Sequence, residues 1–487
     1  NRVIVCERQY LPVVAAAGVG TKLEHVVSVD GGPEGTVTLA DVEGAGDPGF
    51  DFDNAWRAVG RDDVLTLIYT SGTTGPPKGV ELTHANLLTN IAAIMELTTV
   101  DETDRLVSYL PDAHIVNRYM AHYLPAVSGA AVTTVADTKA LVTTLPDVRP
   151  TLFVAVPLFW YKVTAALRAA LDAQTGVRGR LARWAVDVGG RHAGFTARGA
   201  TPPTVVKARA FVAERLVLRP LRERVGLGEV RIAVSGAAPI AAETLEFVLG
   251  LGLPVCEAWG MSELSALVTV NPPDGIRVGT VGKPTAGVEI AVAEDGELLV
   301  RGPGLMKGYR NDPVQTVEAI DPEGWMHTGD IGAFDDDGYL RIVDRKKELI
   351  INSGGKNISP TNIENHVKSG CPLVGSVVAI GDRRPFIVAL ATLDPDAAAA
   401  RAETLSVDAS AAALAEHPEV IDEVQRGVAA ANAKLSRVEQ IKYVKILPVF
   451  WHPGGDELTS TAKLRRKPIA EKYAAEIDRI YDEAMSG

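Results

Sequence analysis

The sequence predicts an α/β fold whose regions differ in the spacing and pairing of their strands, and two observations support this prediction. Before Gly287, short β-branched runs alternate with amphipathic stretches, which is typical of largely parallel sheets covered by helices. From Gly287 onward the strands are closely spaced and are separated by Gly/Asp turns, which favours a small antiparallel barrel or sheet. The expected strands are 65–69, 131–135, 152–156, 230–234 and 254–257 in the first region, and 288–292, 296–300 and 339–343 in the second.

A charged run at 344–348 (Asp-Arg-Lys-Lys-Glu) is too short to form a domain and is typical of a hinge. Beyond it, residues 349–487 have the pattern of a second, smaller α+β unit. Strands are expected at 377–380 and 386–390, and the alanine-rich stretch 397–435 favours helices because alanine has the highest helix propensity. We therefore expect a core at 1–343, a hinge at 344–348 and a smaller carboxy-terminal domain at 349–487.

The amino-terminal residues already have the pattern of a buried strand, since Val3, Ile4 and Val5 follow the first two residues directly. The chain also begins with Asn1 rather than methionine. We therefore expect that the sequence starts inside a domain.

Composition excludes several classes of protein. The chain has 487 residues, enough for two or three domains, and a formal net charge of −12, which does not favour nucleic-acid binding over the whole surface. Its three cysteines are far apart and lack metal-ligand spacing, which favours a reducing, cytoplasmic environment. No apolar run approaches the roughly 18 residues that a membrane-spanning helix needs.

The segment 160–231 differs from the rest of this acidic chain. It holds 14 lysines and arginines against 5 aspartates and glutamates, with leucine, valine and alanine interleaved. A basic amphipathic helix of this kind can lie on an anionic membrane surface. A solvated helical hairpin that covers the core would have the same composition, so both interpretations stay open.

The stretch from Tyr69 to Gly79 combines glycines, hydroxyl side chains and one lysine between an apolar strand and a helix-like pattern from Thr83. Such a loop suits a polyphosphate because its backbone N–H groups and hydroxyls donate hydrogen bonds and its lysine supplies positive charge. It is not a Walker A loop, because no hydroxyl residue follows the lysine. The candidate phosphate-binding residues are Thr70, Ser71, Gly72, Thr73, Thr74, Gly75 and Lys78.

This loop resembles the phosphate-binding loop of the adenylate-forming superfamily, which includes acyl-CoA synthetases, adenylation domains and firefly-type luciferases. Further stretches resemble the other motifs of the superfamily, in the same order along the chain: 235–239 (Ser-Gly-Ala-Ala-Pro), 256–263 (Cys-Glu-Ala-Trp-Gly-Met-Ser-Glu), 325–332 (Trp-Met-His-Thr-Gly-Asp-Ile-Gly) and 458–467 (Leu-Thr-Ser-Thr-Ala-Lys-Leu-Arg-Arg-Lys). The resemblance covers most of the chain, although the superfamily has a sizeable amino-terminal subdomain that this sequence mostly lacks. That departure puts the activity of the isolated chain in doubt.

The resemblance implies how these residues would bind ATP. Trp259 would stack on adenine where most members have tyrosine, and Asp330 would accept hydrogen bonds from both ribose hydroxyls. Glu263 would hold Mg²⁺ on the phosphates, with the Thr70 hydroxyl as the second contributor. The adenine pocket and its surroundings would include Gly236, Ala237, Ala238, Glu257 and Gly260, with Arg345 on the ribose or phosphate.

The resemblance also implies two half-reactions. Lys463, which follows Ala462 where many members have glycine, would be the catalytic lysine of adenylate formation. The mobile carboxy-terminal domain would then swivel about a hinge at Lys347. This movement would present a glycine-rich face that carries Ser353, Gly354 and Gly355 to the thiol of coenzyme A.

Two short stretches of sequence suggest how the acyl group would be bound. His114, in Leu-Pro-Asp-Ala-His, resembles the superfamily's residue near the substrate carboxylate. Trp160, in Val-Pro-Leu-Phe-Trp, resembles the gate of the fatty-acid tunnel in the long-chain branch, although plain core packing is equally compatible with it.

Together these features predict an AMP-forming ligase, closest to bacterial long-chain fatty acyl-CoA synthetases, that uses ATP, Mg²⁺ and coenzyme A to activate a medium- or long-chain fatty acid. Two alternatives stay open. One is a fatty-acyl-AMP ligase that loads a carrier protein, and the other is a truncated module that binds nucleotide or acyl groups without turnover.

Overall fold

The computed structural model describes residues 2–33, 36–70, 77–351, 356–459 and 462–486. The chain forms two compact units, Asn1–Asp63 and Val64–Gly487. Helices and sheets alternate along most of the chain, which confirms the predicted α/β class.

The first unit contains a three-stranded parallel sheet in the order β1-β2-β3. The predicted first strand is present, but the prediction that it is buried is wrong, because Val3 and Val5 are 50% and 59% exposed. Val3 and Val5 are two residues apart, so they lie on the same face of the strand, and this face is exposed. The elements are β1 (Val3–Cys6), α1 (Leu11–Gly18), β2 (His25–Ser28), β3 (Val37–Thr38), α2 (Leu39–Gly44) and α3 (Phe52–Arg57), with a 3₁₀ turn at Arg8–Tyr10.

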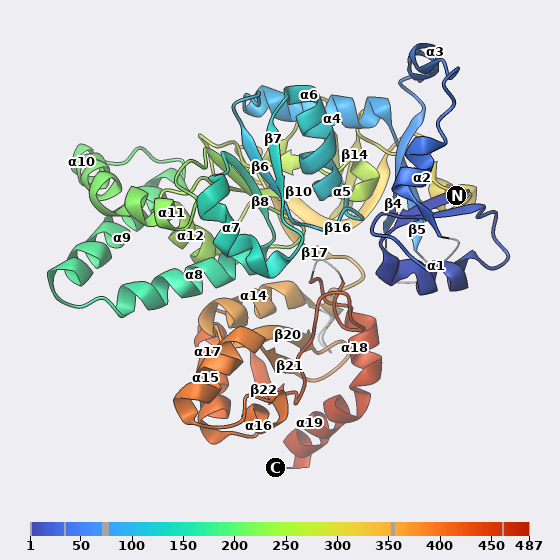
Figure 1. Cartoon of the computed structure of the whole chain (residues 1–487). Helices are drawn as coiled ribbons and strands as arrows, with labels where there is room; N and C mark the ends of the chain where they lie inside the picture. Colours follow the sequence, from blue (N-terminus) through green and yellow to red (C-terminus); the bar gives the residue numbers. More distant parts are fainter. Residues whose placement is uncertain (1, 34–35, 71–76, 352–355, 460–461, 487) are drawn as a thin grey trace. The chain divides into compact units, whose positions relative to one another are not determined.

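A five-stranded sheet in the order β12-β11-β10-β9-β8 forms the centre of the second unit (Figure 1). The first three strands in the sequence are parallel, as predicted, and the last two are antiparallel. The stretch 235–239 begins at the last residue of β9, and the stretch 256–263 contains most of β10 and the turn after it, so both reach the carboxyl edge of the sheet, where α/β folds bind their ligands. The strands are β8 (Leu152–Ala155), β9 (Ile232–Ser235), β10 (Val255–Trp259), β11 (Thr269–Val270) and β12 (Lys283–Pro284).

The strand before the predicted phosphate loop belongs to an antiparallel sheet, not to the parallel one that the alternation suggested. It pairs with β5 in a hairpin, because only a short connection separates the two strands. α4 then begins after Thr83, whose side chain and that of Asn86 form a capping box. The elements are β4 (Val64–Thr70), β5 (Lys78–Thr83), β15 (Gly308–Tyr309) and α4 (His84–Leu97).

A four-stranded antiparallel sheet in the order β13-β14-β16-β17 confirms the change to antiparallel strands that was expected from Gly287. Its strands are β13 (Glu289–Val292), β14 (Glu297–Arg301), β16 (Met326–Phe334) and β17 (Leu340–Arg345), and α13 (Pro313–Ala319) lies between β15 and β16 in the sequence. Asp344 and Arg345, which were predicted to begin the hinge, belong to β17.

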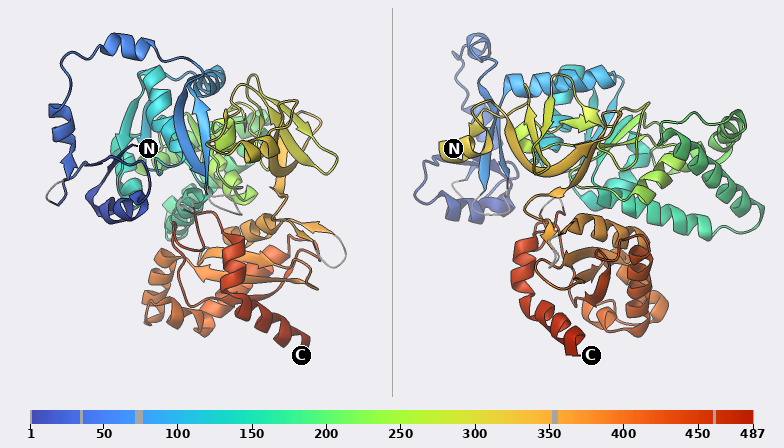
Figure 2. Two further views of the ribbon diagram at one scale, coloured as in Figure 1. Left: turned by 90° about the vertical axis from the view of Figure 1, so that its right-hand side faces the viewer. Right: turned by 180° about the vertical axis from the view of Figure 1, so that it is seen from behind.

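Helices α8 to α11, drawn in green, gather on one side of the β8–β10 sheet (Figures 1 and 2). They contain most of the basic segment 160–231 and pack through their own apolar cluster, which includes Leu167, Ala185 and Leu218. The bounds are α8 (Pro157–Asp172), α9 (Gly176–Thr196), α10 (Thr204–Ala213), a π-helical turn at Glu214–Leu218 and α11 (Arg219–Arg224).

Shorter elements complete this part of the second unit. β6 (Arg105–Ser108) and β7 (Ala131–Thr134) form a parallel pair. The helices are α5 (Ile115–Arg118), a π-helical turn (Tyr119–Tyr123), α6 (Leu124–Ser128), α7 (Leu141–Val148) and α12 (Ala242–Gly250), with 3₁₀ turns at Thr138–Ala140 and Ser262–Leu264.

The last part of the chain contains both predicted strands and the predicted helices (Figure 1, orange to red). Its three-stranded sheet, in the order β20-β21-β22, has a separate apolar core with α14 and α17. The elements are β18 (Ile350–Ile351), β19 (Asn357–Ile358), α14 (Pro360–Gly370), β20 (Val374–Ile380), β21 (Ile387–Leu393), α15 (Pro395–Leu405), α16 (Ala411–Ala415), α17 (Pro418–Asn432), β22 (Ile441–Ile446), α18 (Arg466–Lys472) and α19 (Ala474–Ser486).

Candidate active site

The β4–β5 hairpin presents the two described ends of the predicted phosphate loop side by side. Thr70 and Lys78 are directly paired across the antiparallel strands, so their Cα atoms are neighbours. Ser71, Gly72, Thr73, Thr74 and Gly75 lie outside the described residues.

Tyr309 joins one end of this loop to Glu263. The Lys78 ammonium lies 4.8 Å from the centre of the Tyr309 ring, and the Tyr309 hydroxyl donates a 3.0 Å hydrogen bond to Glu263 Oε1. Backbone pairing of Tyr309 with Val80 holds the ring in this position. Sequence reasoning missed Tyr309, because it belongs to none of the stretches compared above.

Glu263 has the surroundings of an Mg²⁺ ligand. Its side chain is half-buried, and Tyr309 orients its carboxylate. Among the described residues no three carboxylate, histidine or cysteine side chains cluster as a closed metal cage. Mg²⁺ does not need one, since it is commonly bound by one or two carboxylates together with phosphate oxygens and water. The described residues therefore fit an ion that arrives with a nucleotide.

We expect Tyr309→Phe to raise the Mg²⁺ concentration for half-maximal adenylate formation by about tenfold, because a group that orients a metal ligand typically contributes this much. The phenylalanine ring keeps the surface that Lys78 contacts. Tyr339→Phe is the matched control, since Tyr339 donates a 2.8 Å hydrogen bond to the Gly275 carbonyl elsewhere in the core. An Mg²⁺ dependence equal to that of the unmodified protein would contradict the role of Tyr309.

Asp330 is held between two donors. It is only 4% exposed, and Arg345, its direct neighbour across β16 and β17, contacts Oδ1 through Nε at 2.7 Å. The Trp259 indole N–H donates a 2.8 Å hydrogen bond to Oδ2. Burial raises the pKa of Asp330, whereas the Arg345 charge and the Trp259 hydrogen bond lower it. The contact with Trp259 was not expected from the sequence, which predicted only that this ring stacks on adenine.

Lys463 lies within electrostatic range of these groups. The Lys463 side chain is exposed to solvent. Nevertheless, the surrounding protein partly desolvates its ammonium group, which lowers the pKa of Lys463, and the positive charge of Arg345 lowers this pKa further. The opposing negative charges belong to Asp330, Glu348 and Glu263.

The turn before Lys463 has a left-handed residue. Ala462 has φ of 60°, a conformation that glycine adopts without steric cost and alanine does not. Thr459 closes the turn, because its hydroxyl accepts a 3.0 Å hydrogen bond from the Lys463 N–H. This backbone geometry explains why a glycine would suit the position before the lysine.

His114 caps the amino end of α5 through its ring. Nδ1 accepts a 3.2 Å hydrogen bond from the Val116 N–H, which assigns the proton of the neutral ring to Nε2. Burial, followed by the charge of Lys463, lowers the pKa of His114 to about 4. The ring is therefore neutral near pH 7 and can donate a hydrogen bond from Nε2.

Two glycine-containing turns follow β9 and β10. Ala237 has φ of 71°, so the predicted adenine turn at Gly236, Ala237 and Ala238 has a left-handed residue at its centre. At Gly260, a Cβ atom would lie 1.9 Å from the Ala266 carbonyl oxygen. Close backbone approach therefore requires glycine at position 260, independently of any ligand.

Glu257 is a buried acid in the same region. It is 7% exposed, and among the described residues its Oε2 has no hydrogen-bond partner. Burial raises the pKa of Glu257 to about 8, although the backbone N–H groups of Gly279 and Ile240 oppose this shift. At neutral pH the carboxyl group is therefore largely protonated.

The pKa of Glu257 predicts a pH-dependent stability. The folded protein retains this proton up to about pH 8, whereas the unfolded chain releases it near its ordinary pKa of 4.5. The folded state therefore binds more protons between these values, and the free energy of unfolding falls as the pH rises through this window. Glu257→Gln cannot ionise, so we expect it to gain stability relative to the unmodified protein from pH 5 to pH 8 in urea titrations. Parallel curves for the two proteins would contradict this assignment.

Of the remaining predicted residues, Trp160 and Lys347 are described and the glycine-rich stretch of the carboxy-terminal domain is not. Trp160 is fully buried and meets the Phe153 and Phe159 rings edge-on, a packing that suits a closed gate and a core residue equally. Lys347 follows β17 in a turn, and its role as the hinge stays a prediction. Ser353, Gly354 and Gly355 lie outside the described residues.

Comparisons with known proteins are consistent with these motifs. Residues 2–310 match the model of the family "AMP-binding enzyme", and residues 347–485 match that of the "AMP-binding enzyme C-terminal domain". FadD11 of Mycobacterium tuberculosis, provisionally named a fatty-acid–CoA ligase, is 52% identical over 92% of this chain and 79% of its own length. FadD15 of the same species, named a long-chain-fatty-acid–CoA ligase, is 38% identical over 96% of this chain and 78% of its own length.

The fold is also similar to that of solved structures. The adenylation domain of a carboxylate reductase from Mycobacterium chelonae has a TM-score of 0.72 at 20% identity and covers 99% of this chain and 73% of that one. The chain therefore belongs to the AMP-binding enzyme family, the adenylate-forming superfamily that its motifs resemble.

Proposed function

We propose that this protein is an AMP-forming fatty-acid–CoA ligase that first joins a medium- or long-chain fatty acid to AMP and then transfers the acyl group to coenzyme A. One observation carries the proposal: Asp330 and Glu263 lie near enough to Lys463 for their charges to raise its pKa, and Lys463 lies near enough to His114 to lower the pKa of that ring, although these residues come from widely separated parts of the chain. The names of relatives such as FadD15 support the choice of acid and acceptor.

In the first half-reaction, a carboxylate oxygen of the fatty acid attacks the α-phosphorus of ATP. The new bond joins this oxygen to phosphorus, and the bond from the α-phosphorus to the bridging oxygen breaks as pyrophosphate leaves. The reactants are anions, so catalysis depends on positioning and on compensation of negative charge. Lys463 supplies positive charge, and the neutral His114 donates a hydrogen bond from Nε2 to the carboxylate. Asp330 holds the ribose, while Mg²⁺ at Glu263 and Thr70 would neutralise phosphate charge.

In the second half-reaction, the thiolate of coenzyme A attacks the acyl carbon and AMP leaves. The proposed domains are 1–343 and 349–487. Of the hinge predicted at 344–348, Asp344 and Arg345 belong to β17, so the change of backbone angles is proposed at Lys347, after this strand ends. A swivel about this hinge would remove Lys463 and bring Ser353, Gly354 and Gly355 towards the thiol.

A pyrophosphate-release assay with palmitate and ATP, with and without coenzyme A, tests the proposal when it is combined with product analysis. We expect pyrophosphate release and formation of palmitoyl-CoA. Pyrophosphate release without a thioester would favour the carrier-loading alternative. ATP binding without pyrophosphate release would instead identify a module without turnover. A panel of fatty acids in the same assay defines the preferred chain length.

We further propose that the basic helices contact an anionic membrane from which the fatty acid is taken. Phe211 is 64% exposed, and the exposed Lys207 and Arg215 lie one turn before and after it. Further exposed apolar side chains on these helices are Val177, Leu181, Val205, Val212 and Leu216. This combination of apolar and basic side chains is the one that binds a lipid surface.

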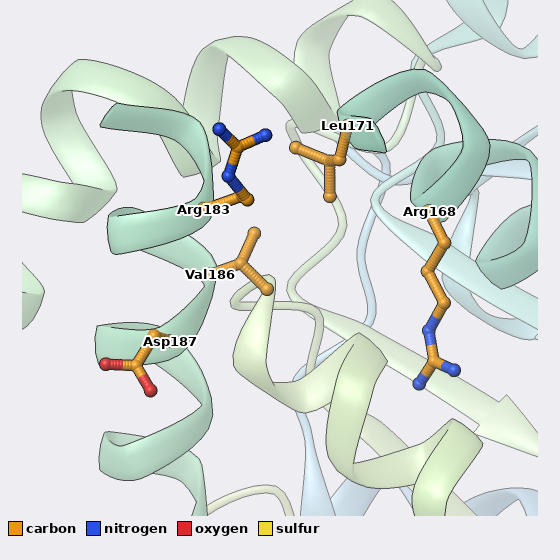
Figure 3. A pocket seen from close by; sticks show the side chains of 5 residues that line it. All are labelled: Arg168, Leu171, Arg183, Val186 and Asp187. Carbon is orange, nitrogen blue, oxygen red and sulfur yellow. The ribbon is translucent and has the colours of Figure 1, made fainter. Parts of the chain in front are cut away.

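A cavity of about 340 Å³ adjoins these helices. Figure 3 shows Arg183, Val186 and Asp187 along α9 on one side, and Arg168 and Leu171 from α8 on the other. Its lining combines apolar and basic side chains, as the exposed surface of these helices does, and this combination supports lipid contact. In the part of the chain that the structure describes, no helix is long and apolar enough to span a bilayer.

Co-sedimentation with phosphatidylserine-containing vesicles tests the membrane proposal. We expect binding that weakens with salt. Phe211→Ser/Leu216→Ser should reduce it at least about tenfold, because burial of one such apolar side chain contributes roughly 1.5–3 kcal/mol. Val314→Ser/Val317→Ser is the matched control, since both residues are exposed valines on α13 outside the basic helices. Equal loss in both double variants would contradict a specific contact.

We also propose a cytoplasmic location, which the three free cysteines support.

A further inference from the structure

The carboxylate of Asp330 is fixed at both oxygens by side chains from two different sheets. Arg345 Nε lies 2.7 Å from Oδ1 and belongs to β17, the strand next to Asp330. Trp259 Nε1 lies 2.8 Å from Oδ2 and comes from the end of β10 in the central sheet. Asp330 and Trp259 are 4% and 9% exposed, so little water competes for this hydrogen bond.

The Trp259 indole can act only as a hydrogen-bond donor here, and strand pairing fixes the backbone of Trp259. Indole has one N–H group and no acceptor, so the Trp259 bond does not depend on how a proton is oriented. Trp259 pairs with Thr269 of β11, and Gly260 allows the Ala266 carbonyl to approach the following turn. Both ends of the hydrogen bond therefore belong to strands, which hold a side chain more accurately than loops do.

An ionised carboxylate has about four acceptor positions, two on each oxygen. Arg345 and Trp259 each occupy one of them, which leaves one position on each oxygen. Two free positions on neighbouring oxygens suit the two hydroxyls of a vicinal diol. Rotation of the carboxylate would spoil this match, and the two side-chain contacts from Arg345 and Trp259 oppose such rotation.

We propose that Trp259 is a positioning residue that orients Asp330 and thereby sets the preference of the site for ribonucleotides over 2′-deoxyribonucleotides. The inference rests on the proposed function, in which Asp330 holds the ribose of ATP. It assigns to the edge of the Trp259 ring a task separate from the stacking predicted for its face.

Binding of ATP and 2′-dATP to the whole chain, measured by calorimetry without fatty acid, tests this inference. We expect the unmodified protein to prefer ATP and Trp259→Phe to reduce the ratio of the two affinities about tenfold, because one hydrogen bond to a charged group is lost. Trp259→Tyr should also reduce the ratio, because its donor lies elsewhere on the ring. It serves as the second variant if the phenylalanine variant does not fold.

Trp451→Phe is the matched control. Its indole N–H donates a 3.1 Å hydrogen bond to the Tyr473 hydroxyl in the carboxy-terminal part of the chain, so we expect an unchanged ratio. A folded Trp259 variant with the affinity ratio of the unmodified protein would overturn the inference. Equal affinity of the unmodified protein for both nucleotides would overturn it as well, whatever the ligase assay shows. Selective ATP binding that depends on Trp259 would support it even if no acyl-CoA were formed.

Discussion

Replacement of Lys463 by alanine is expected to lower the rate of adenylate formation by about 10²–10³-fold, which is the usual effect of removing one preorganised group from developing charge. Lys463 lies within electrostatic range of Asp330 and Glu263. In the proposed mechanism its charge compensates that of the reacting phosphates, and this compensation is lost in the variant. Thioester formation from supplied acyl-adenylate should continue, because the proposed swivel removes Lys463 before that step. Single-turnover assays of the two half-reactions measure both rates.

Lys467→Ala provides the control for Lys463. Lys467 lies four residues further along the chain and only approaches Glu471, at 3.9 Å on the surface, so both half-reactions should keep their rates. Equal losses in both half-reactions of Lys463→Ala would refute the separation of roles between two faces of the carboxy-terminal domain.

Replacement of Asp330 by alanine is expected to raise KM for ATP by about 10²-fold, because both acceptors for the ribose hydroxyls are lost. The same change leaves Arg345 and the buried Trp259 indole without their shared partner. We therefore also expect a loss of about 1–3 kcal/mol in the free energy of unfolding. Steady-state kinetics and urea unfolding measure the two effects separately.

Asp335→Asn is the matched control for Asp330. Asp335 lies just after β16, and its carboxylate contacts Arg277 at 3.3 Å. Asp335→Asn should lower the free energy of unfolding by a similar or smaller amount, while KM for ATP stays unchanged. If both variants raised KM equally, the effect of Asp330→Ala would be a general loss of structure rather than of ribose binding.

Local patterns in the sequence predicted most of the strands, because side-chain periodicity and turn residues act over a few positions. The strands at 152–156 and 254–257 occur as β8 and β10, with bounds that shift by one or two residues. The pairing of β4 was predicted less well, since an alternation of strands and helices does not reveal which strand meets which. Its hairpin with β5 depends on the connection between them.

The candidate site was predicted as a set of residues but not as a set of contacts. Trp259 and Asp330 are 71 positions apart, and only the relative placement of two sheets makes their hydrogen bond. Tyr309 reaches Glu263 across 46 positions for the same reason. The αL geometry of Ala462 was also hidden, although a replaced glycine is the kind of signal that could have indicated it.

The pairing of Thr70 with Lys78 has a consequence for protein engineering. Successive residues of a strand point to opposite faces of the sheet, so a slip of one position would turn Lys78 away from the Tyr309 ring. A library built in β4 or β5 should therefore exchange amino acids at constant length. An insertion or deletion within either strand would shift the register of the hairpin before any new side chain could be tested.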